Sequence, residues 1–234
     1  MDNEQKFVNP GKNKSVKVGD TLYRRLCIKT HVITNKDNII DVAVKYAKPL
    51  IKDGDTLVIS EKAVACTQGR AIPLEEIKPR KLAVFLSKHV TKTPVGIGLG
   101  MPETMEMALR ECGTPRILFA AFVSVIGKLF GRKGWFYKVA GDKARSIDGP
   151  CHYTLPPYNK YVVLGPDNPD AVANKIKEAL GINAAIIDAN DLGCVILGSS
   201  KGALTKDTLC AILKDNPLGQ TDEQTPMGII RVES

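Results

Sequence analysis

The stretch of sequence that decides the fold runs from Tyr161 to Gly198 and reads YVVLGPDNPDAVANKIKEALGINAAIIDANDLGCVILG. Its short apolar runs flank one segment whose apolar residues recur every three to four positions, which is the period of a helix. The pattern predicts strand, helix, strand and strand, in that order, at residues 161–164, 169–180, 184–187 and 194–197. Asp170 is expected to cap the helix, because a carboxylate favours the positive end of the helix dipole, and Gly181 is expected to end it.

An acidic turn follows the second of these strands. Asp188, Asn190 and Asp191 lie where that buried strand emerges. Carboxylate and amide oxygens gathered at the end of a strand can hold a divalent cation against the phosphates of a ligand. The same residue types also favour ordinary Asx turns, so the residues alone leave a metal site and a plain turn open.

The first third of the chain has a similar alternation of strand and helix. A mixed apolar and basic run at 22–34 predicts a strand, 39–47 carries the apolar stripe of a helix, and 56–60 is a β-prone run. Ser60 and Lys62 lie where that last strand ends, so a hydroxyl and an ammonium group there can meet a phosphate. A solvated turn uses the same residue types, and both interpretations stay open.

The middle of the chain, residues 71–145, is the least regular part. It predicts a helix after Pro79, helices at 102–112 and 118–130, the latter as a core helix, and a strand at 135–140. Gly96, Gly98 and Gly100 suggest a phosphate loop, but their spacing is neither Gly-x-Gly-x-x-Gly nor Gly-x-x-x-x-Gly-Lys-Ser/Thr. A flexible loop before the next helix is the favoured interpretation. A last apolar run at 227–232 closes the chain.

Size and charge restrict the classes of function. A chain of 234 residues can bury a sizeable core, as one large domain or two small intertwined ones. The formal net charge of +8 is spread along the chain, which favours an anionic small-molecule ligand over a nucleic-acid surface. Aromatic residues make up only 6% of the sequence, and no basic stretch is interleaved with them as a single-strand-binding platform requires. No nucleic-acid partner is therefore expected.

The compartment is predicted to be the cytoplasm. The first residues, Met1 to Lys14, are polar and charged, unlike a signal peptide. The longest apolar stretch, Leu118 to Phe130, is too short to span a bilayer, so no membrane partner is expected. The six cysteines include no Cys-x-x-Cys pair and are expected to be reduced and mostly buried, at positions 27, 66, 112, 151, 194 and 210.

Three blocks of sequence together resemble the γ-glutamyl ligase family that adds glutamate to the deazaflavin coenzyme F-420. They lie at residues 30–55, beginning Thr-His-Val-Ile; at 57–70, with Ser-Glu-Lys and Gly-Arg; and at 161–193, ending in the acidic turn. The order and spacing of these blocks match the family over roughly residues 20–200.

The resemblance implies an α/β fold with mixed sheets, assembled as an intertwined homodimer. A flexible leader at 1–15 would precede a single ligase-like domain at 16–234, in which residues 96–133 form an insert-like region that does not align with the family. The implied reaction uses GTP or ATP to phosphorylate a small carboxylate acceptor. The amine of an amino acid such as L-glutamate then displaces the phosphate to form an amide. Mn²⁺ or Mg²⁺ would bridge the phosphates and offset their charge.

The resemblance also assigns roles to individual residues. The positions that match the family's nucleotide-binding elements are His31, Val32, Ile33, Ser60 and Lys62. The positions that match or lie beside its metal ligands are Asp148, Asp188, Asn190 and Asp191.

The chain departs from the family pattern at several of these places. Asn190-Asp191-Leu192-Gly193-Cys194 stands where the family has Asp-Thr-x-Gly-Arg, so a carboxylate has moved by one position and an arginine is missing. Gln68 replaces an acidic residue, and Asp148 is not followed by the usual Ser-Asn. These changes leave an alternative open, in which the protein keeps the ligase fold but is a non-catalytic ligand-binding or regulatory protein. A purely structural scaffold would also explain the altered motifs.

Overall fold

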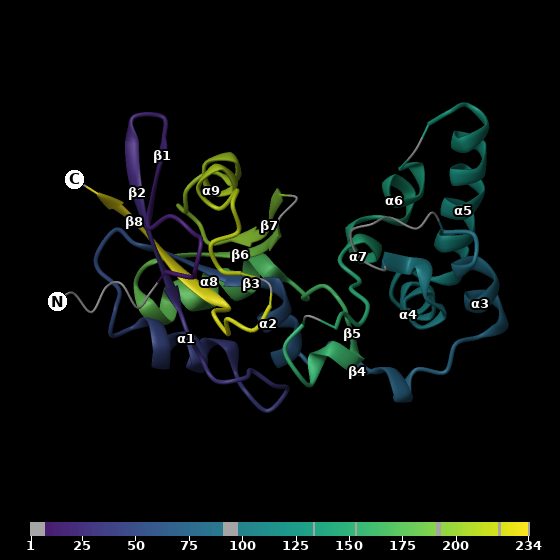
Figure 1. Cartoon of the computed structure of the whole chain (residues 1–234), viewed down its shortest axis with the longest axis horizontal. Helices are drawn as coiled ribbons and strands as arrows, with labels where there is room; N and C mark the ends of the chain where they lie inside the picture. Colours follow the sequence, from purple (N-terminus) through teal and green to yellow (C-terminus); the bar gives the residue numbers. More distant parts are fainter. Residues whose placement is uncertain are drawn as a thin grey trace. The chain divides into compact units, whose positions relative to one another are not determined.

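The structure is a computed structural model that describes residues 8–90, 98–132, 134–152, 154–190, 193–219 and 221–233 (Figure 1). The chain folds into two compact units. The first consists of Met1–Gly69 together with Pro166–Ser234, and the second of Arg70–Gly165. Both units combine helices with strands, and the fold is mixed α/β as the sequence predicts. The single domain expected at 16–234 stays a prediction.

A six-stranded sheet organises the first unit, in the order β1-β2-β8-β3-β6-β7. The strands are β1 (Ser15–Val18), β2 (Thr21–Ile28), β3 (Thr56–Ser60), β6 (Asn183–Asn190), β7 (Gly193–Ser199) and β8 (Met227–Glu233). β3 and β6 pair in parallel, and the other described pairs are antiparallel. The mixed sheet expected from the resemblance is therefore present.

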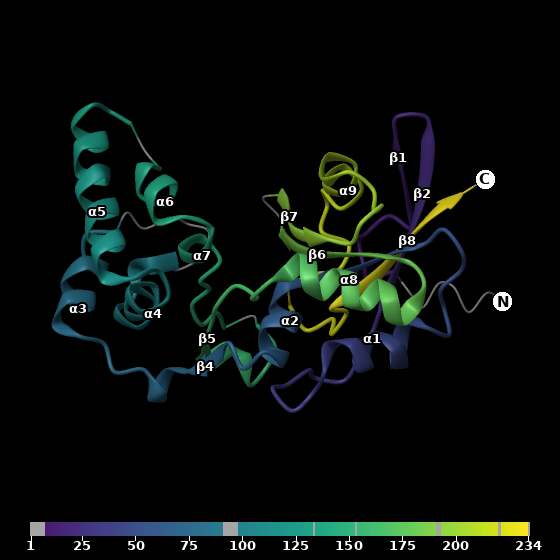
Figure 2. The same cartoon turned by 180° about the vertical axis from the view of Figure 1, so that it is seen from behind.

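Helices cover both faces of this sheet. They are α1 (Ile39–Ala47), α2 (Glu61–Thr67), α8 (Pro169–Leu180) and α9 (Lys206–Ile212). Successive residues of a strand point to opposite faces. Leu57 and Ile59 of β3 accordingly pack in the cluster that contains α1 and α8, whereas Val58 packs with Leu209 and Ile212 of α9. Figure 2 shows the same arrangement from behind.

The start of α8 packs tightly against β7. A Cβ atom at Gly198 would lie 2.4 Å from the backbone nitrogen of Asp170, so this approach requires glycine. The Asp170 carboxylate accepts a hydrogen bond from the backbone N–H of Ser199 at 2.8 Å. The N-cap residue is Asn168, with φ 48°, so the helix is predicted correctly but the capping role given to Asp170 is wrong.

The second unit is mainly helical. Its helices are α3 (Lys81–Ser87), α4 (Pro102–Cys112), α5 (Thr114–Leu129), α6 (Trp135–Ala140) and α7 (Asp142–Arg145), with short 3₁₀ turns at Leu74–Glu76, Gly98–Gly100 and Tyr158–Lys160. A two-stranded antiparallel sheet pairs β4 (Ala71–Pro73) with β5 (Tyr161–Val163). The strand expected at 161–164 thus forms, but in a different sheet from β6 and β7.

Two expectations for this unit need correction. The run Trp135–Ala140, expected as a strand, is the helix α6. The Trp135 ring lies so close to α5 that a Cβ atom at Gly127 would be 3.1 Å from it, and this packing overrides the strand preference of an aromatic run. The expected core helix at 118–130 does form within α5, but its outward face is exposed.

Within the described residues, no single helix is long and apolar enough to cross a membrane. α4 and α5 meet the length and composition criteria only as a pair, and they are bent by 116° where they join. None of the six cysteines forms a disulfide bond; Cys27 and Cys66 are buried and the other four are half-buried, so the expectation of mostly buried thiols holds for only two.

Candidate functional site at one edge of the sheet

Three strands of the first unit end at the same edge of the sheet. Ile28, the last residue of β2, and Ile59 of β3 both pair with Met227 at the start of β8. Ser60 at the end of β3 pairs with Ile187 of β6, one residue before Asp188. The topology therefore brings together, at one edge, the loop that contains His31, the Ser60–Lys62 segment and the acidic end of β6.

The imidazole of His31 is held at both of its nitrogens. Nδ1 lies 2.9 Å from the hydroxyl oxygen of Tyr46, and Nε2 lies 3.0 Å from Oδ1 of Asp37. The backbone N–H and hydroxyl of Thr34 donate to Oδ2 of Asp37 at 2.7 and 3.0 Å. The hydrogen bond from the Thr34 backbone, followed by that from His31, lowers the pKa of Asp37. Asp37 is thus a carboxylate that fixes the loop and orients the ring.

The other residues of the predicted nucleotide loop differ in exposure. Val32 is half-buried, whereas the side chain of Ile33 packs in the core between the sheet, α1 and α8. The Ile33 side chain therefore serves packing, and a ligand contact from this residue would have to come from its backbone.

Ser60 and Lys62 lie at the junction of β3 and α2. The backbone N–H of Ser60 donates to the carbonyl of Pro226 at 2.8 Å, which continues the sheet to the edge. The Ser60 side chain makes no capping hydrogen bond to α2 and is half-buried, and Lys62 is exposed. A hydroxyl and an ammonium group therefore stand at the strand end.

The predicted metal ligands lie in both units. Asp188 and Asn190 are half-buried residues of β6, paired with Val195 and Gly193. Asp148 belongs to the second unit, where its backbone N–H and C=O bond those of Val163, each at 2.9 Å. Asp191 lies outside the described residues.

The donor atoms on β6 fit a hard cation only in part. A carboxylate and an amide oxygen are the ligand types that Mn²⁺ and Mg²⁺ take. In the part of the chain that the structure describes, however, no three His, Cys, Asp or Glu residues come together as a metal site. The described residues therefore supply only part of a cation site.

Gln68 was noted in the sequence only as the replacement of an acidic residue, and the structure gives it a role. Its side-chain amide donates to the carbonyl of Asp167 at 2.9 Å and accepts from the Asp167 backbone N–H at 2.8 Å. The amide thereby joins the end of α2 to the loop before α8. A carboxylate at this position would accept the second bond but could not donate the first.

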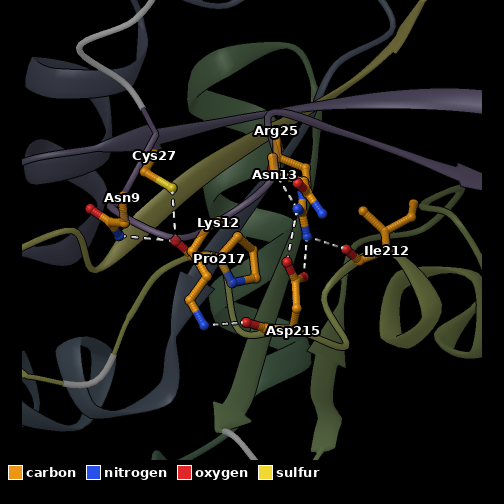
Figure 3. Close-up of polar contacts among 8 residues, drawn as sticks. All are labelled: Asn9, Lys12, Asn13, Arg25, Cys27, Ile212, Asp215 and Pro217. Atoms are coloured by element: carbon orange, nitrogen blue, oxygen red, sulfur yellow. Dashed lines mark hydrogen bonds and ion pairs between the residues drawn. The ribbon is translucent and has the colours of Figure 1, made fainter.

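A buried arginine anchors the N-terminal segment to the C-terminal loop (Figure 3). The Arg25 guanidinium donates to the carbonyl of Asn13, to the carbonyl of Ile212 at 3.0 Å and to the Asp215 carboxylate. Nearby, Asn9 and the Cys27 thiol both donate to the carbonyl of Pro217, at 2.9 and 3.1 Å. Sequence reasoning missed this network, although an arginine in the middle of a predicted strand is a signal for a buried partner.

A pocket of about 560 Å³ opens beside this network, and Tyr46, the partner of His31, lines it. Its charged lining residues are Lys29, Asp222 and Glu223. Both the volume and the mixture of apolar walls with a few polar groups are typical of small-molecule sites.

Comparison with known proteins adds one match. Residues 27–189, more than half of the chain, match the family model described as F420-0:Gamma-glutamyl ligase. A search of curated proteins finds no match. The matched range contains His31, Ser60, Lys62 and Asp188, and it ends before Asn190.

Proposed function

The chain belongs to the F420-0:gamma-glutamyl ligase family, and on that premise we propose that it is a ligase that uses a nucleotide and a divalent metal to form an amide of the γ-glutamyl type. The family supports the ligase role. The nucleotide, the metal and the acyl-phosphate intermediate are our proposals, as are a homodimeric assembly and a cytoplasmic location.

One observation carries the proposal. The His31 loop, the Ser60–Lys62 segment and Asp188 come from parts of the chain that are far apart in sequence, and they meet where β2, β3 and β6 reach one edge of the sheet. Ligands of α/β sheets commonly bind outside the ends of the strands. The nearby pocket beside Tyr46 has the volume of a small-molecule site, which supports a ligand site at the same edge of the sheet.

The proposed reaction has two steps. A carboxylate oxygen of the acceptor attacks the γ-phosphorus of GTP or ATP, the bond to the bridging oxygen breaks, and GDP or ADP leaves. The amine of an amino acid such as L-glutamate then attacks the acyl carbon, phosphate leaves with the bonding electrons, and the amine loses a proton. An exposed ammonium such as that of Lys62 suits the charge that develops on the phosphates.

If bound, Mn²⁺ or Mg²⁺ would supply positive charge to offset that of the nucleotide phosphates. Asp188, Asn190 and Asp191 of the first unit are the candidates to hold it, and Asp148 is a separate candidate in the second unit. The nucleotide would contact Val32, the Ile33 backbone, Ser60, Lys62 and the imidazole of His31, which Asp37 and Tyr46 keep in one orientation.

Thermal-shift titration with GTP and ATP, each with and without Mn²⁺ or Mg²⁺, tests the nucleotide site. A ligand that binds only the folded protein adds about 2.7 kcal/mol of stability at a hundred times its Kd, which raises the melting temperature by a few degrees. Lys62→Ala is expected to abolish most of the shift. Lys175→Ala, which changes an exposed lysine on α8, serves as the matched control. Equal shifts in both variants would remove Lys62 from the site.

A second candidate is a ligand-binding or regulatory protein without turnover. Gln68 favours it, because the residue that replaces the family's acid is committed to two hydrogen bonds with Asp167. This candidate predicts a metal-dependent nucleotide shift without release of GDP or ADP, whatever carboxylate acceptor accompanies L-glutamate. Detection of either product would exclude it.

A further inference from the structure

The outward face of α5 is an exposed apolar surface. Leu118, Phe122, Val125 and Leu129 follow one another at intervals of four, three and four residues, so they form a single stripe along the helix. All four are exposed, Phe122 by 61% and Leu129 by 80%. Phe119 widens the stripe and Phe130 extends it beyond the end of the helix; both are also exposed.

The opposite face of α5 is already packed. Ile117 and Ala120 are buried in the core of the second unit, and Gly127 lies against the Trp135 ring. The outward stripe is therefore not needed to hold α5 in place. An exposed apolar surface of this kind is typical of an interaction site.

The charges of the segment that carries the stripe are all of one sign. From Thr114 to Gly141 the sequence contains no Asp or Glu, and its cations are Arg116, Lys128, Arg132, Lys133 and Lys138. The four of these that the structure describes, all except Lys133, are exposed. Arg116 is directed toward α6, where its guanidinium donates to the carbonyl of Val139 at 2.9 Å. The segment that carries the stripe therefore has exposed cations and no acid, and it complements an anionic partner.

We infer that this face of α5 docks on the surface of an anionic lipid bilayer. The phenylalanine and leucine side chains enter the boundary between headgroups and acyl chains, while the surrounding lysines and arginines contact anionic headgroups. The helix lies along the surface: its 16 residues extend about 24 Å, short of the roughly 30 Å of a hydrocarbon core. The absence of a stretch long enough to span a bilayer is the reason for expecting no membrane partner, but peripheral docking does not require a span.

A second copy of the chain fits this face less well. Pairing two such faces would bring two cationic surfaces without acidic partners into contact, which costs free energy. The stripe covers fewer than two heptads, whereas a coiled-coil seam needs at least three or so. The inference is independent of the proposed ligase activity, since it uses no residue of the sheet edge.

Co-flotation with lipid vesicles tests the inference on the full-length chain. The protein is expected to float with vesicles of phosphatidylcholine that contain about a third phosphatidylserine, and to stay behind with pure phosphatidylcholine. Val125→Asp is expected to lower the bound fraction at least about tenfold, because it places a carboxylate against the headgroups. Val232→Asp changes a valine of matching exposure on β8, 55% against 59%, and should leave binding unchanged.

A second pair of variants changes charge alone. Lys128→Glu on α5 is expected to weaken binding severalfold, and Lys175→Glu on α8 to leave it unchanged. Because this pair keeps every apolar side chain, it tests the inference even if Val125→Asp perturbs the fold. A lowered melting temperature of Val125→Asp would reveal such a perturbation.

Three outcomes would overturn the inference. They are no binding to anionic vesicles, equal binding of all four variants, or a dimer in light scattering that Val125→Asp alone converts to monomer without any vesicle binding by the unmodified chain. The last outcome would assign the face to a second copy.

Discussion

Gln68 and Asp167 exchange two hydrogen bonds although 99 residues separate them in the sequence. The side-chain amide donates to the Asp167 carbonyl and accepts from the Asp167 backbone N–H, so both of its polar atoms are used. This contact fixes the end of α2 relative to the loop that leads into α8. It also depends on an amide, because a carboxylate offers no donor.

Gln68→Glu is therefore expected to lower the free energy of unfolding by about 1 kcal/mol at pH 7, measured by urea denaturation. At pH values below the ordinary pKa of glutamate, about 4.3, the introduced acid is protonated and regains a donor. The difference from the unmodified chain should then shrink. Gln68→Met, which has no such donor at any pH, is the control. If the loss of unfolding free energy in Gln68→Glu is the same at both pH values, the hydrogen-bond explanation is contradicted.

Glu106 is the buried acid of the second unit. Its side chain is 2% exposed and accepts hydrogen bonds from the backbone N–H of Arg80 and from Nε of Arg80 and Arg110, at 2.8 to 3.1 Å. Burial by itself raises the pKa of this carboxyl, but the hydrogen bonds from the two arginines and the charge of Arg80 outweigh it and hold the pKa below its usual value. Glu106→Gln is expected to lower the free energy of unfolding by about 2–3 kcal/mol at pH 7, measured by urea denaturation.

The pH dependence of this loss has a definite sign. A group whose pKa is lower in the folded state stabilises the protein fully above its unfolded pKa, about 4.3 for glutamate, and less as the pH falls through the folded value. The difference in the free energy of unfolding between Glu106→Gln and the unmodified chain should therefore become smaller below about pH 4. Glu103→Gln on the same helix serves as the control, and a gap that does not change with pH would refute the role of the charge.

β7 contains two glycines in different surroundings. A Cβ atom at Gly198 would lie 2.4 Å from backbone atoms at the start of α8, whereas one at Gly193 would meet no atom within 4 Å. Gly198→Ala is expected to destabilise the first unit by about 3 kcal/mol, because backbone cannot move aside as a side chain can. Gly193→Ala should change stability by less than about 1 kcal/mol. Equal melting temperatures for the two variants would show that α8 can move away from β7.

Local patterns in the sequence were enough to predict most elements of the first unit. The apolar runs at 56–60 and 184–187 and the periodic segment at 169–180 became β3, β6 and α8, since each pattern is contained in its own segment. The pairing partners were less readable. The run at 161–164 is readable as a strand, but no local pattern shows that β5 pairs with β4 or that Val163 bonds Asp148, because such contacts follow from packing over long sequence distances.

The candidate site was predictable only as separate pieces. The strand ends that carry Ser60 and Asp188 could be located, because turn-forming and charged residues follow apolar runs there. That they share an edge follows from the parallel pairing of β3 with β6, which no local pattern specifies. The partners of His31 were also hidden: Tyr46 read as part of a helix stripe, and only the folded loop brings its hydroxyl to the ring.

The last prediction concerns the contact between His31 and Asp37. Asp37 uses one carboxylate oxygen for the His31 ring and the other for the backbone N–H and hydroxyl of Thr34. Asp37→Asn removes the negative charge and replaces one of these acceptors by an NH₂ group, so neither the ring nor the loop keeps a charge-assisted hydrogen bond to this side chain. If this loop contacts the nucleotide, affinity for GTP or ATP in the presence of Mn²⁺ should fall about tenfold, the equivalent of one charge-assisted hydrogen bond. Isothermal titration measures the change directly.

Two further variants separate the orientation of the His31 ring from the loss of a nearby negative charge. Tyr46→Phe removes only the hydroxyl that lies 2.9 Å from Nδ1 and should give a smaller loss of affinity than Asp37→Asn, since Thr34 and Asp37 still hold the loop. Asp41→Asn, an exposed acid in the first turn of α1, removes the same charge close by and should leave affinity unchanged. If all three variants bind nucleotide like the unmodified chain, the His31 loop is not part of the site, and the proposal would rest on Ser60, Lys62 and the end of β6 alone.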